Sequence, residues 1–171
     1  MGPMTPLGAL ARGIVSGAVG TLAMDLVLYL RYRRGGGEQR FADFEFSSGL
    51  DSWDQAPAPA QVGKRLLEGF LQREEPASRA RLVDNVMHWG YGLAWGAQYG
   101  IVAGSFPTPP VRSGLAFGSL IWLSDYVVLP LAKLYKPIWE YDGKTLAEDL
   151  GAHLAYSVGT TATFRLLTRN A

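Results

Sequence analysis

Four long stretches of this chain are apolar and nearly free of charge, and they constrain its fold more than any other feature. They run over about Leu7–Leu30, Leu82–Gly104, Val111–Leu131 and Thr145–Leu167. Each is close to the roughly 20 residues that an α-helix needs to cross a bilayer. A soluble helix would carry a charged face, whereas 86–104 and 113–124 carry no charge at all. The pattern predicts an all-α, four-transmembrane-helix bundle that forms a single integral membrane domain over residues 1–171.

Basic residues are unevenly divided between the segments that link these stretches. Twelve of the 16 Lys and Arg residues lie in 31–81 and 132–144, which a four-span chain places on one side of the membrane. Because loops rich in Lys and Arg stay in the cytoplasm, we expect the loop 31–81 to be cytoplasmic and both termini to face outward. The first stretch lacks a charged leader and is interrupted by Asp25, so it is interpreted as a retained helix and not as a signal peptide.

The long loop 31–81 contains one amphipathic segment, Ala60–Arg73. Its apolar side chains are Val62, Leu66, Leu67, Phe70 and Leu71, and its charged ones include Lys64, Arg65, Glu68 and Arg73. The two sets fall on opposite faces at helical spacing. The segment predicts a cytoplasmic amphipathic helix that either lies on the membrane surface or packs on the protein's own loops. The short link 105–110, which holds three prolines, predicts a tight turn.

Small residues recur at every fourth position in each of the four stretches. Because no water drives helices together inside a membrane, bundles there depend on small residues that let backbones approach closely. The rows consist of Gly13 and Gly17; Gly92, Gly96 and Gly100; Gly114 and Gly118; and Gly151 and Gly159, with Ala155 between the last two. The rows predict a tightly packed bundle, and any row left on its surface suits a homo-oligomer.

The second and fourth stretches share a spaced polar motif. It comprises Asp84, His88 and Tyr91 in one stretch and Asp149, His153 and Tyr156 in the other. The first and third stretches also correspond, because a glycine pair precedes Asp25 in one and Asp125 in the other at nearly the same distance. We interpret the chain as two helix-pair repeats related by an axis along the membrane normal. Chance recurrence of short patterns is the alternative.

These eight residues form the candidate site, a polar cluster buried toward the cytoplasmic side. Asp25, His88, Asp125 and His153 lie about 9–13 Å from the nearest flanking basic residue, at ~1.5 Å of rise per residue. Because residues four apart share a helix face, each of Asp84 and Asp149 can pair with the histidine that follows it.

Three interpretations of this cluster stay open. In the first, the acidic residues favour helix starts and the histidines pin neighbouring helices, so the cluster is structural. In the second, the Asp–His pairs carry protons or admit a cation, because a histidine beside a carboxylate titrates near neutral pH. In the third, His88, His153, Asp84 and Asp149 bind a divalent metal, although their spacing is generic.

Composition and motifs exclude several function classes. The chain has no cysteine, so it has neither a thiolate nucleophile nor a cysteine-based metal site. Its net charge of +1 and the lack of a long basic run argue against nucleic acid as a partner. No nucleophile–base motif, phosphate-binding loop or nucleotide fingerprint appears. An enzyme is therefore the class that the sequence supports least, and we expect no cofactor.

The last three stretches resemble the YagU-like family of small bacterial inner-membrane proteins, whose function is unknown. The shared features are His88; the run ending Gln98-Tyr99-Gly100; Gly114 and Gly118; Pro130, Leu134 and Pro137; and Asp149 with His153. The family tends to carry histidine where this chain has Asp125. The resemblance implies a multi-pass protein of the bacterial inner membrane that is associated with stress or acid tolerance.

Taken together, the sequence favours a small membrane protein that acts in ion or proton transport or in a stress response. The alternative is a non-catalytic scaffold, whose loop helix Ala60–Arg73 binds a partner or lipid. The bilayer itself is an expected partner in both.

Overall fold

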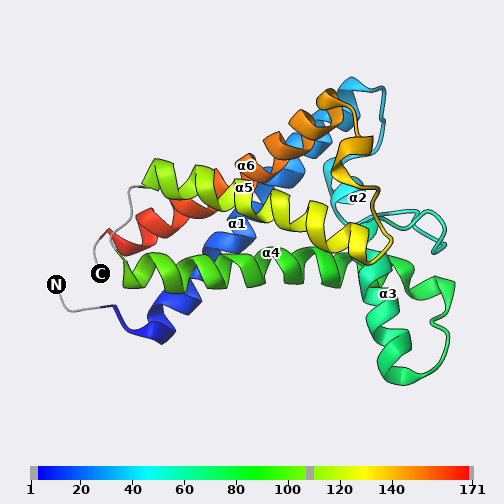
Figure 1. The fold of residues 1–171 in the computed structure, drawn as a ribbon, viewed down its shortest axis with the longest axis horizontal. Coiled ribbons are helices and arrows are strands. Elements are labelled where there is room, and N and C mark those ends of the chain that lie inside the picture. Colours follow the sequence, from blue (N-terminus) through cyan, green and yellow to red (C-terminus); the bar gives the residue numbers. More distant parts are fainter. Residues whose placement is uncertain (1–3, 107–109, 170–171) are drawn as a thin grey trace.

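Four long helices form the body of the protein, and two shorter helices pack at one end of it (Figure 1). The computed structural model describes residues 4–106 and 110–169. Its α-helices are α1 (Pro6–Arg34), α2 (Phe41–Glu45), α3 (Ala58–Leu71), α4 (Ala80–Ser105), α5 (Pro110–Leu131) and α6 (Gly143–Thr168), with 3₁₀ turns at Ala77–Arg79 and Ile138–Glu140. No strand occurs among these residues. The all-α prediction is confirmed, and the long helices begin and end within four residues of the predicted bounds. The predicted turn at 105–110 falls partly on 107–109, outside the described residues.

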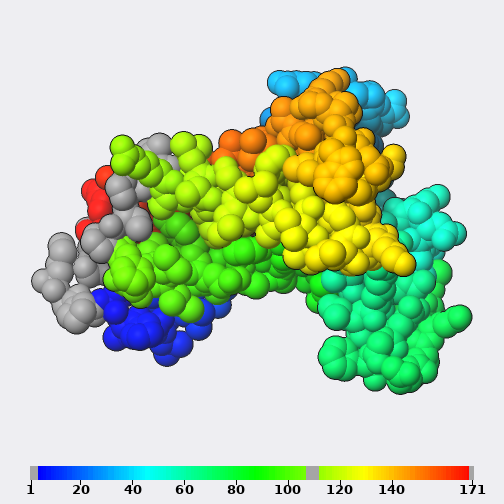
Figure 2. Space-filling view, in the orientation of Figure 1, coloured from blue at the N-terminus to red at the C-terminus, as the bar shows by residue number. Residues whose placement is uncertain are grey.

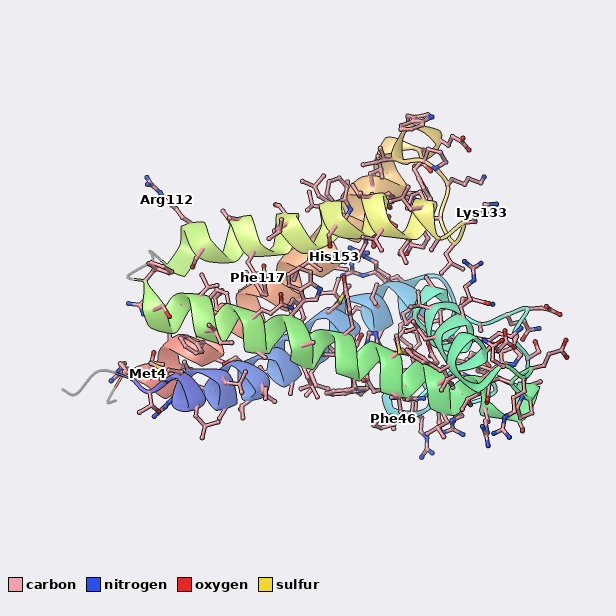
Figure 3. All side chains as sticks on the ribbon, turned by 60° about the horizontal axis from the view of Figure 1, so that its bottom comes forward. Met4, Phe46, Arg112, Phe117, Lys133 and His153 are labelled. Atoms are coloured by element: carbon pink, nitrogen blue, oxygen red, sulfur yellow. The ribbon has the colours of Figure 1, made fainter. Side chains whose placement is uncertain are left out.

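Helices α1 and α5 run in one direction and helices α4 and α6 run in the other (Figure 1). The start of α1 and the end of α6 therefore lie at the same end of the body. The opposite end carries α2 and α3, and we call it the loop-bearing end. Met4 and Arg112 mark the first end in Figure 3, and Phe46 and Lys133 mark the loop-bearing end.

Helices α1 and α4 pack backbone against backbone. A Cβ atom added at Gly13 would lie 2.5 Å from the carbonyl oxygen of Gly96, and one added at Gly17 would lie 2.6 Å from that of Gly92. A Cβ at Gly100 would come within 2.7 Å of the Cα of Gly13. Real side chains do not approach backbone atoms this closely, so only glycine fits along this contact.

Small hydroxyl residues fill the contacts that α6 makes with α1 and α5. A Cβ at Gly20 would collide with Thr160, and a Cβ at Gly118 would lie 2.6 Å from the hydroxyl of Ser157. The hydroxyl of Thr160 bonds to the carbonyl of Tyr156 at 2.9 Å, within its own helix. Gly151 packs more loosely than the others, since an added Cβ would meet only the Arg31 guanidinium at 3.2 Å. The polar side chains in these contacts are thus satisfied without any water.

Helices α4 and α5 meet through long aromatic side chains instead. Tyr99 and Phe117 have ring centroids 5.0 Å apart, and Trp95 packs edge-on against Phe117 at 6.0 Å. Tyr99 and Phe117 belong to the main apolar cluster of the body, together with Ile121, Tyr156 and Phe164. We call this contact the α4–α5 seam. It joins side chains and leaves the two backbones apart, in contrast to the α1–α4 contact.

Beside its aromatic cluster, the interior of the body holds small polar residues, and its surface is largely aliphatic. Its largest fully buried side chains are Thr21, Thr160, Ser16 and Ser157. Large aliphatic side chains lie exposed along the four long helices. They include Leu7, Val15, Leu22, Leu26 and Leu30 on α1, Val86 and Val102 on α4, Leu120, Val127 and Val128 on α5, and Val158 and Leu166 on α6. Single exposed apolar side chains are ordinary in soluble proteins, so what distinguishes this surface is their number along all four long helices.

Two of the long helices are long and apolar enough to cross a membrane by length and composition alone. They are Pro6–Arg34 and, within α5, Arg112–Leu131. Core helices of soluble proteins and signal sequences pass the same test, so the case for a membrane depends on the surface described above. Helices α4 and α6 also hold charged and histidine residues, which lower their mean hydropathy. Four spans were predicted, and two helices among the described residues reach the hydropathy expected of a span.

Helix α3 packs on the first turns of α4. Ala60 and Gly63 face inward, and a Cβ at Gly63 would lie 2.4 Å from the side chain of Val83. Ala60 and Val83 form a second apolar cluster with Trp53 and Ala80. The predicted amphipathic helix is present, but it turns its small residues toward α4. Its large residue Phe70 stays 85% exposed.

Candidate functional site

The first half of the candidate site is an ion pair between α1 and α4. His88 Nε2 lies 3.0 Å from both carboxylate oxygens of Asp25 and donates to them. Asp25 is buried, and the His88 side chain is 28% exposed. The close glycine packing of α1 on α4 brings these two side chains together from positions far apart in the chain.

A third side chain, Glu45 at the end of α2, completes this cluster. One ligand-type atom from each of Asp25, Glu45 and His88 lies within 4.8 Å of the others. Glu45 is only 8% exposed, and neither of its carboxylate oxygens has a hydrogen-bond partner. Burial, with the Asp25 carboxylate beside it, raises the pKa of Glu45 to about 7.

Aromatic packing holds α2, and with it Glu45, against the end of α1. Phe44 packs on Tyr29 and Tyr32 with ring centroids 5.5 Å and 5.1 Å apart, and Phe41 meets Tyr29 edge-on at 5.2 Å. Phe41 and Phe44 lie three residues apart and so share one face of the short helix. Sequence reasoning missed Glu45. The phenylalanine spacing around it was the signal that could have indicated a docked helix.

The second half of the site joins α5 to α6 in the same manner. His153 Nε2 lies 3.1 Å from a carboxylate oxygen of Asp125, and its Nδ1 lies 2.9 Å from the carbonyl oxygen of Asp149. A carbonyl can only accept, so Nδ1 carries a proton. Nε2 faces a carboxylate, so a further proton sits on either His153 or Asp125. The pair therefore holds this proton between α5 and α6.

Of the two acidic residues four positions before the histidines, Asp149 makes the predicted ion pair with His153, whereas Asp84 has a different partner. Asp84 accepts a hydrogen bond from Ser47 at 2.5 Å. The side chain of Asp149 lies 3.8 Å from His153, farther than the carbonyl of the same residue. The closest carboxylates to the histidines are those of Asp25 and Asp125 on neighbouring helices, because the crossing of the helices brings them nearer than the residues on the same face.

The two tyrosines of the motif differ in their roles. Tyr91 donates to Asp125 at 2.7 Å across the α4–α5 seam, so Asp125 binds both Tyr91 and His153. Tyr156 donates to the carbonyl oxygen of Gly92 at 2.6 Å and ties α6 to α4. The two predicted repeats thus share a His–Asp contact between their helices. Their tyrosines differ, because one binds a carboxylate and the other a backbone carbonyl.

An open pocket of about 340 Å³ lies next to the second pair, at the loop-bearing end. Arg31, Tyr126, Tyr135, Tyr141, Thr145, Glu148 and Asp149 line it. Asp149, whose side chain lies 3.8 Å from His153, is the lining residue nearest to the second pair in the chain of contacts. Figure 3 shows His153 between the long helices.

The structure does not bring the four predicted metal ligands together as one group. The ligand-type side chains that it does gather within the described residues are Asp25, Glu45 and His88. Of the predicted set, only His88 belongs to this group. Asp84 and Asp149 are engaged with Ser47 and His153 respectively.

Comparisons of the chain with protein families, with curated proteins and with solved structures found no match. The fold and the site described above are therefore the basis for a functional proposal.

Proposed function

We propose that this chain is a four-span protein of the bacterial inner membrane, with α1, α4, α5 and α6 as the spans and the loop 31–81 in the cytoplasm. The exposed aliphatic side chains of all four helices support this proposal, because lipid would cover them. Among the charged and histidine residues that lower the hydropathy of α4 and α6, Asp84 and His153 are buried, and the exposed ones lie near the helix ends, at Arg81, Lys144, Glu148 and Arg165. The skew of Lys and Arg toward the loop-bearing end gives the orientation.

Within that membrane body, the chain would move protons or small cations through its His–Asp pairs. The observation that carries this proposal is the presence of two buried pairs, with Nε2–carboxylate distances of 3.0 Å and 3.1 Å, on separate pairs of helices. Ionisable residues inside membranes are expensive and characteristically mark ion pathways and proton relays. The α4–α5 seam is where such a path would open, since no backbone contact has to break there. Tyr91, which crosses the seam to Asp125, would link the two halves.

The transport proposal predicts that replacing both histidines abolishes ion movement. We expect His88→Ala with His153→Ala to reduce pH-dependent flux in proteoliposomes to the level of empty vesicles, because neither pair can then hold its proton. Gly69→Ala is the matched control, since an added Cβ at this α3 glycine meets nothing within 4 Å. Flux that persists in the double variant, or that is missing in the unaltered protein, would overturn the proposal.

An internal duplication and a link to the YagU-like family form part of the same proposal. Each His–Asp pair joins the first helix of one predicted repeat to its second, α1 to α4 and α5 to α6. The family resemblance depends on the motifs quoted above, and under it the chain would serve in stress or acid tolerance as a single 171-residue membrane domain.

A second candidate function, membrane-surface or partner docking by α3, is favoured by one specific observation. Phe70, Leu66 and Leu71 form an exposed apolar face on α3, and α3 runs across the direction of α4 in Figure 1. A helix with this orientation would lie flat on the cytoplasmic membrane surface. The space-filling view in Figure 2 shows α3 projecting from the loop-bearing end.

For this second candidate, Phe70→Ser with Leu66→Ser is expected to leave the fold intact and to move α3 away from lipid. The measurement is quenching of a fluorophore on α3 by brominated lipids in reconstituted protein. Quenching that is equal in the variant and the unaltered protein would count against an interfacial α3.

A further inference from the structure

We propose that Asp25, Glu45 and His88 form a binding site for one divalent transition-metal ion, Zn²⁺ or Mn²⁺. This inference concerns the same His88–Asp25 pair but does not rest on the transport proposal, because a bound ion can stabilise the protein whether or not ions cross the membrane. It also differs from the predicted set of ligands, since two of its three residues were not in that set.

The spacing of the three side chains suits a single ion. Their ligand atoms lie within 4.8 Å of one another, and His88 Nε2 is 3.0 Å from each Asp25 oxygen. Ligands bound at roughly 2.0–2.2 Å from one ion lie about 3–4 Å apart. A small inward movement of Glu45 would therefore complete the coordination. The ion would replace the proton that His88 now shares with Asp25.

The state of Glu45 is the independent observation that points to a ligand. Its side chain is more than nine-tenths buried, at 8% exposed, and both oxygens lack a hydrogen-bond partner. The Trp89 indole N–H is the donor that acts on Glu45, but it forms no hydrogen bond of normal geometry with it, and a buried carboxylate without such bonds costs free energy. A cation between Glu45, Asp25 and His88 would supply the missing partner. No other described carboxylate combines burial of this extent with two unpartnered oxygens.

The three ligands lie on three separate helices, so a bound ion would link these helices to one another. Asp25 comes from α1, Glu45 from α2 and His88 from α4. Helix α2 has only five residues, and its place is fixed by Phe41, Phe44 and this cluster. Metal binding would therefore dock the start of the long loop onto the membrane body.

The donor set selects the class of ion. Two carboxylates and one imidazole, without sulfur, suit Zn²⁺ and Mn²⁺. Mg²⁺ and Ca²⁺ prefer oxygen ligands throughout. Water would complete the coordination sphere from the loop-bearing side.

The second His–Asp pair offers an internal control. His153 uses both ring nitrogens, on Asp125 and on the carbonyl of Asp149. No third carboxylate satisfies the same spacing there among the described residues. Only the pair that contains His88 should bind the ion.

The test is metal binding by the full-length protein in detergent after treatment with a chelator. Dialysis against Zn²⁺ and, separately, Mn²⁺, followed by elemental analysis, should give one bound ion per chain for at least one of the two metals. Glu45→Gln should weaken binding at least tenfold, whereas Asp149→Asn should leave it unchanged. Circular dichroism checks that each variant is folded. If Glu45→Gln does not fold, His88→Gln takes its place as the test of metal binding.

The spectrum of Co²⁺, used as a probe in place of Zn²⁺, gives a second readout. We expect d–d absorption bands that are present in the unaltered protein and lost in Glu45→Gln. Failure of the unaltered protein to bind either metal would overturn the proposal, as would equal losses in Glu45→Gln and Asp149→Asn. Since no flux is measured, a negative transport assay would leave this result unaffected.

Discussion

Replacing Gly96 with leucine is expected to separate α1 from α4 and leave little folded protein. An added Cβ at Gly96 would lie 2.4 Å from the Cα of Gly17 and 2.5 Å from the carbonyl oxygen of Gly13. Both are backbone atoms, so no rotamer change can relieve the clash. Overpacking of side chains already costs about 1–3 kcal/mol, and forcing two backbones apart should exceed that range.

The matched control for this substitution is Gly90→Leu in the same helix. An added Cβ at Gly90 meets nothing within 4 Å, and the change raises helix propensity. We expect it to leave the unfolding midpoint unchanged or slightly higher. Reversible unfolding in mixed micelles compares the two variants. Equal destabilisation by both would show that α1 and α4 do not pack through this glycine row.

Replacing Asp125 with alanine is the second change with a large expected effect. Asp125 accepts from His153 at 3.1 Å and from Tyr91 at 2.7 Å, and its loss leaves both donors without that partner. The side chains of His153 and Asp125 are 9% and 18% exposed. Removing one member of a buried pair costs about 3–5 kcal/mol, because the other stays buried without compensation.

Asp149→Ala serves as the comparison for Asp125→Ala. The side chain of Asp149 is 28% exposed and lies 3.8 Å from His153, so we expect a loss below about 1 kcal/mol. The contact of His153 with the backbone carbonyl of Asp149 survives this change. Denaturant unfolding in micelles measures both variants. A cost for Asp149→Ala as large as that for Asp125→Ala would refute the assignment of Asp125 as the main partner.

Hydrophobic patterning predicts the helices of this protein well but says little about which side chains meet. The positions of the long helices follow from uninterrupted apolar runs, which depend only on local sequence. The pairing of His88 with Asp25 depends on how α4 crosses α1, which periodicity does not encode. Residue spacing therefore indicated Asp84, on the same helix face as His88, as the partner of that histidine. In the structure, Asp84 accepts a hydrogen bond from Ser47.

Glu45 shows a second limit of sequence reasoning. Its helix has five residues and gives no periodic signal, and its importance depends on tertiary packing of Phe44 against Tyr29 and Tyr32. The amphipathic pattern of α3 was read correctly as a helix. Which face packs inward was decided by Ala60 and Gly63, since only small residues allow α3 to approach Val83 closely.

The composition of the interior of the body has a thermodynamic consequence. Exposing apolar surface is what gives protein unfolding its large positive heat-capacity change. Separating these helices would uncover the aromatic cluster around Tyr99, Phe117 and Tyr156 together with small hydroxyl residues, while many large aliphatic side chains are outside already. The heat-capacity change of helix separation should therefore be smaller than that of a soluble domain of the same length. The stability curve of this protein would accordingly be flatter than that of such a domain.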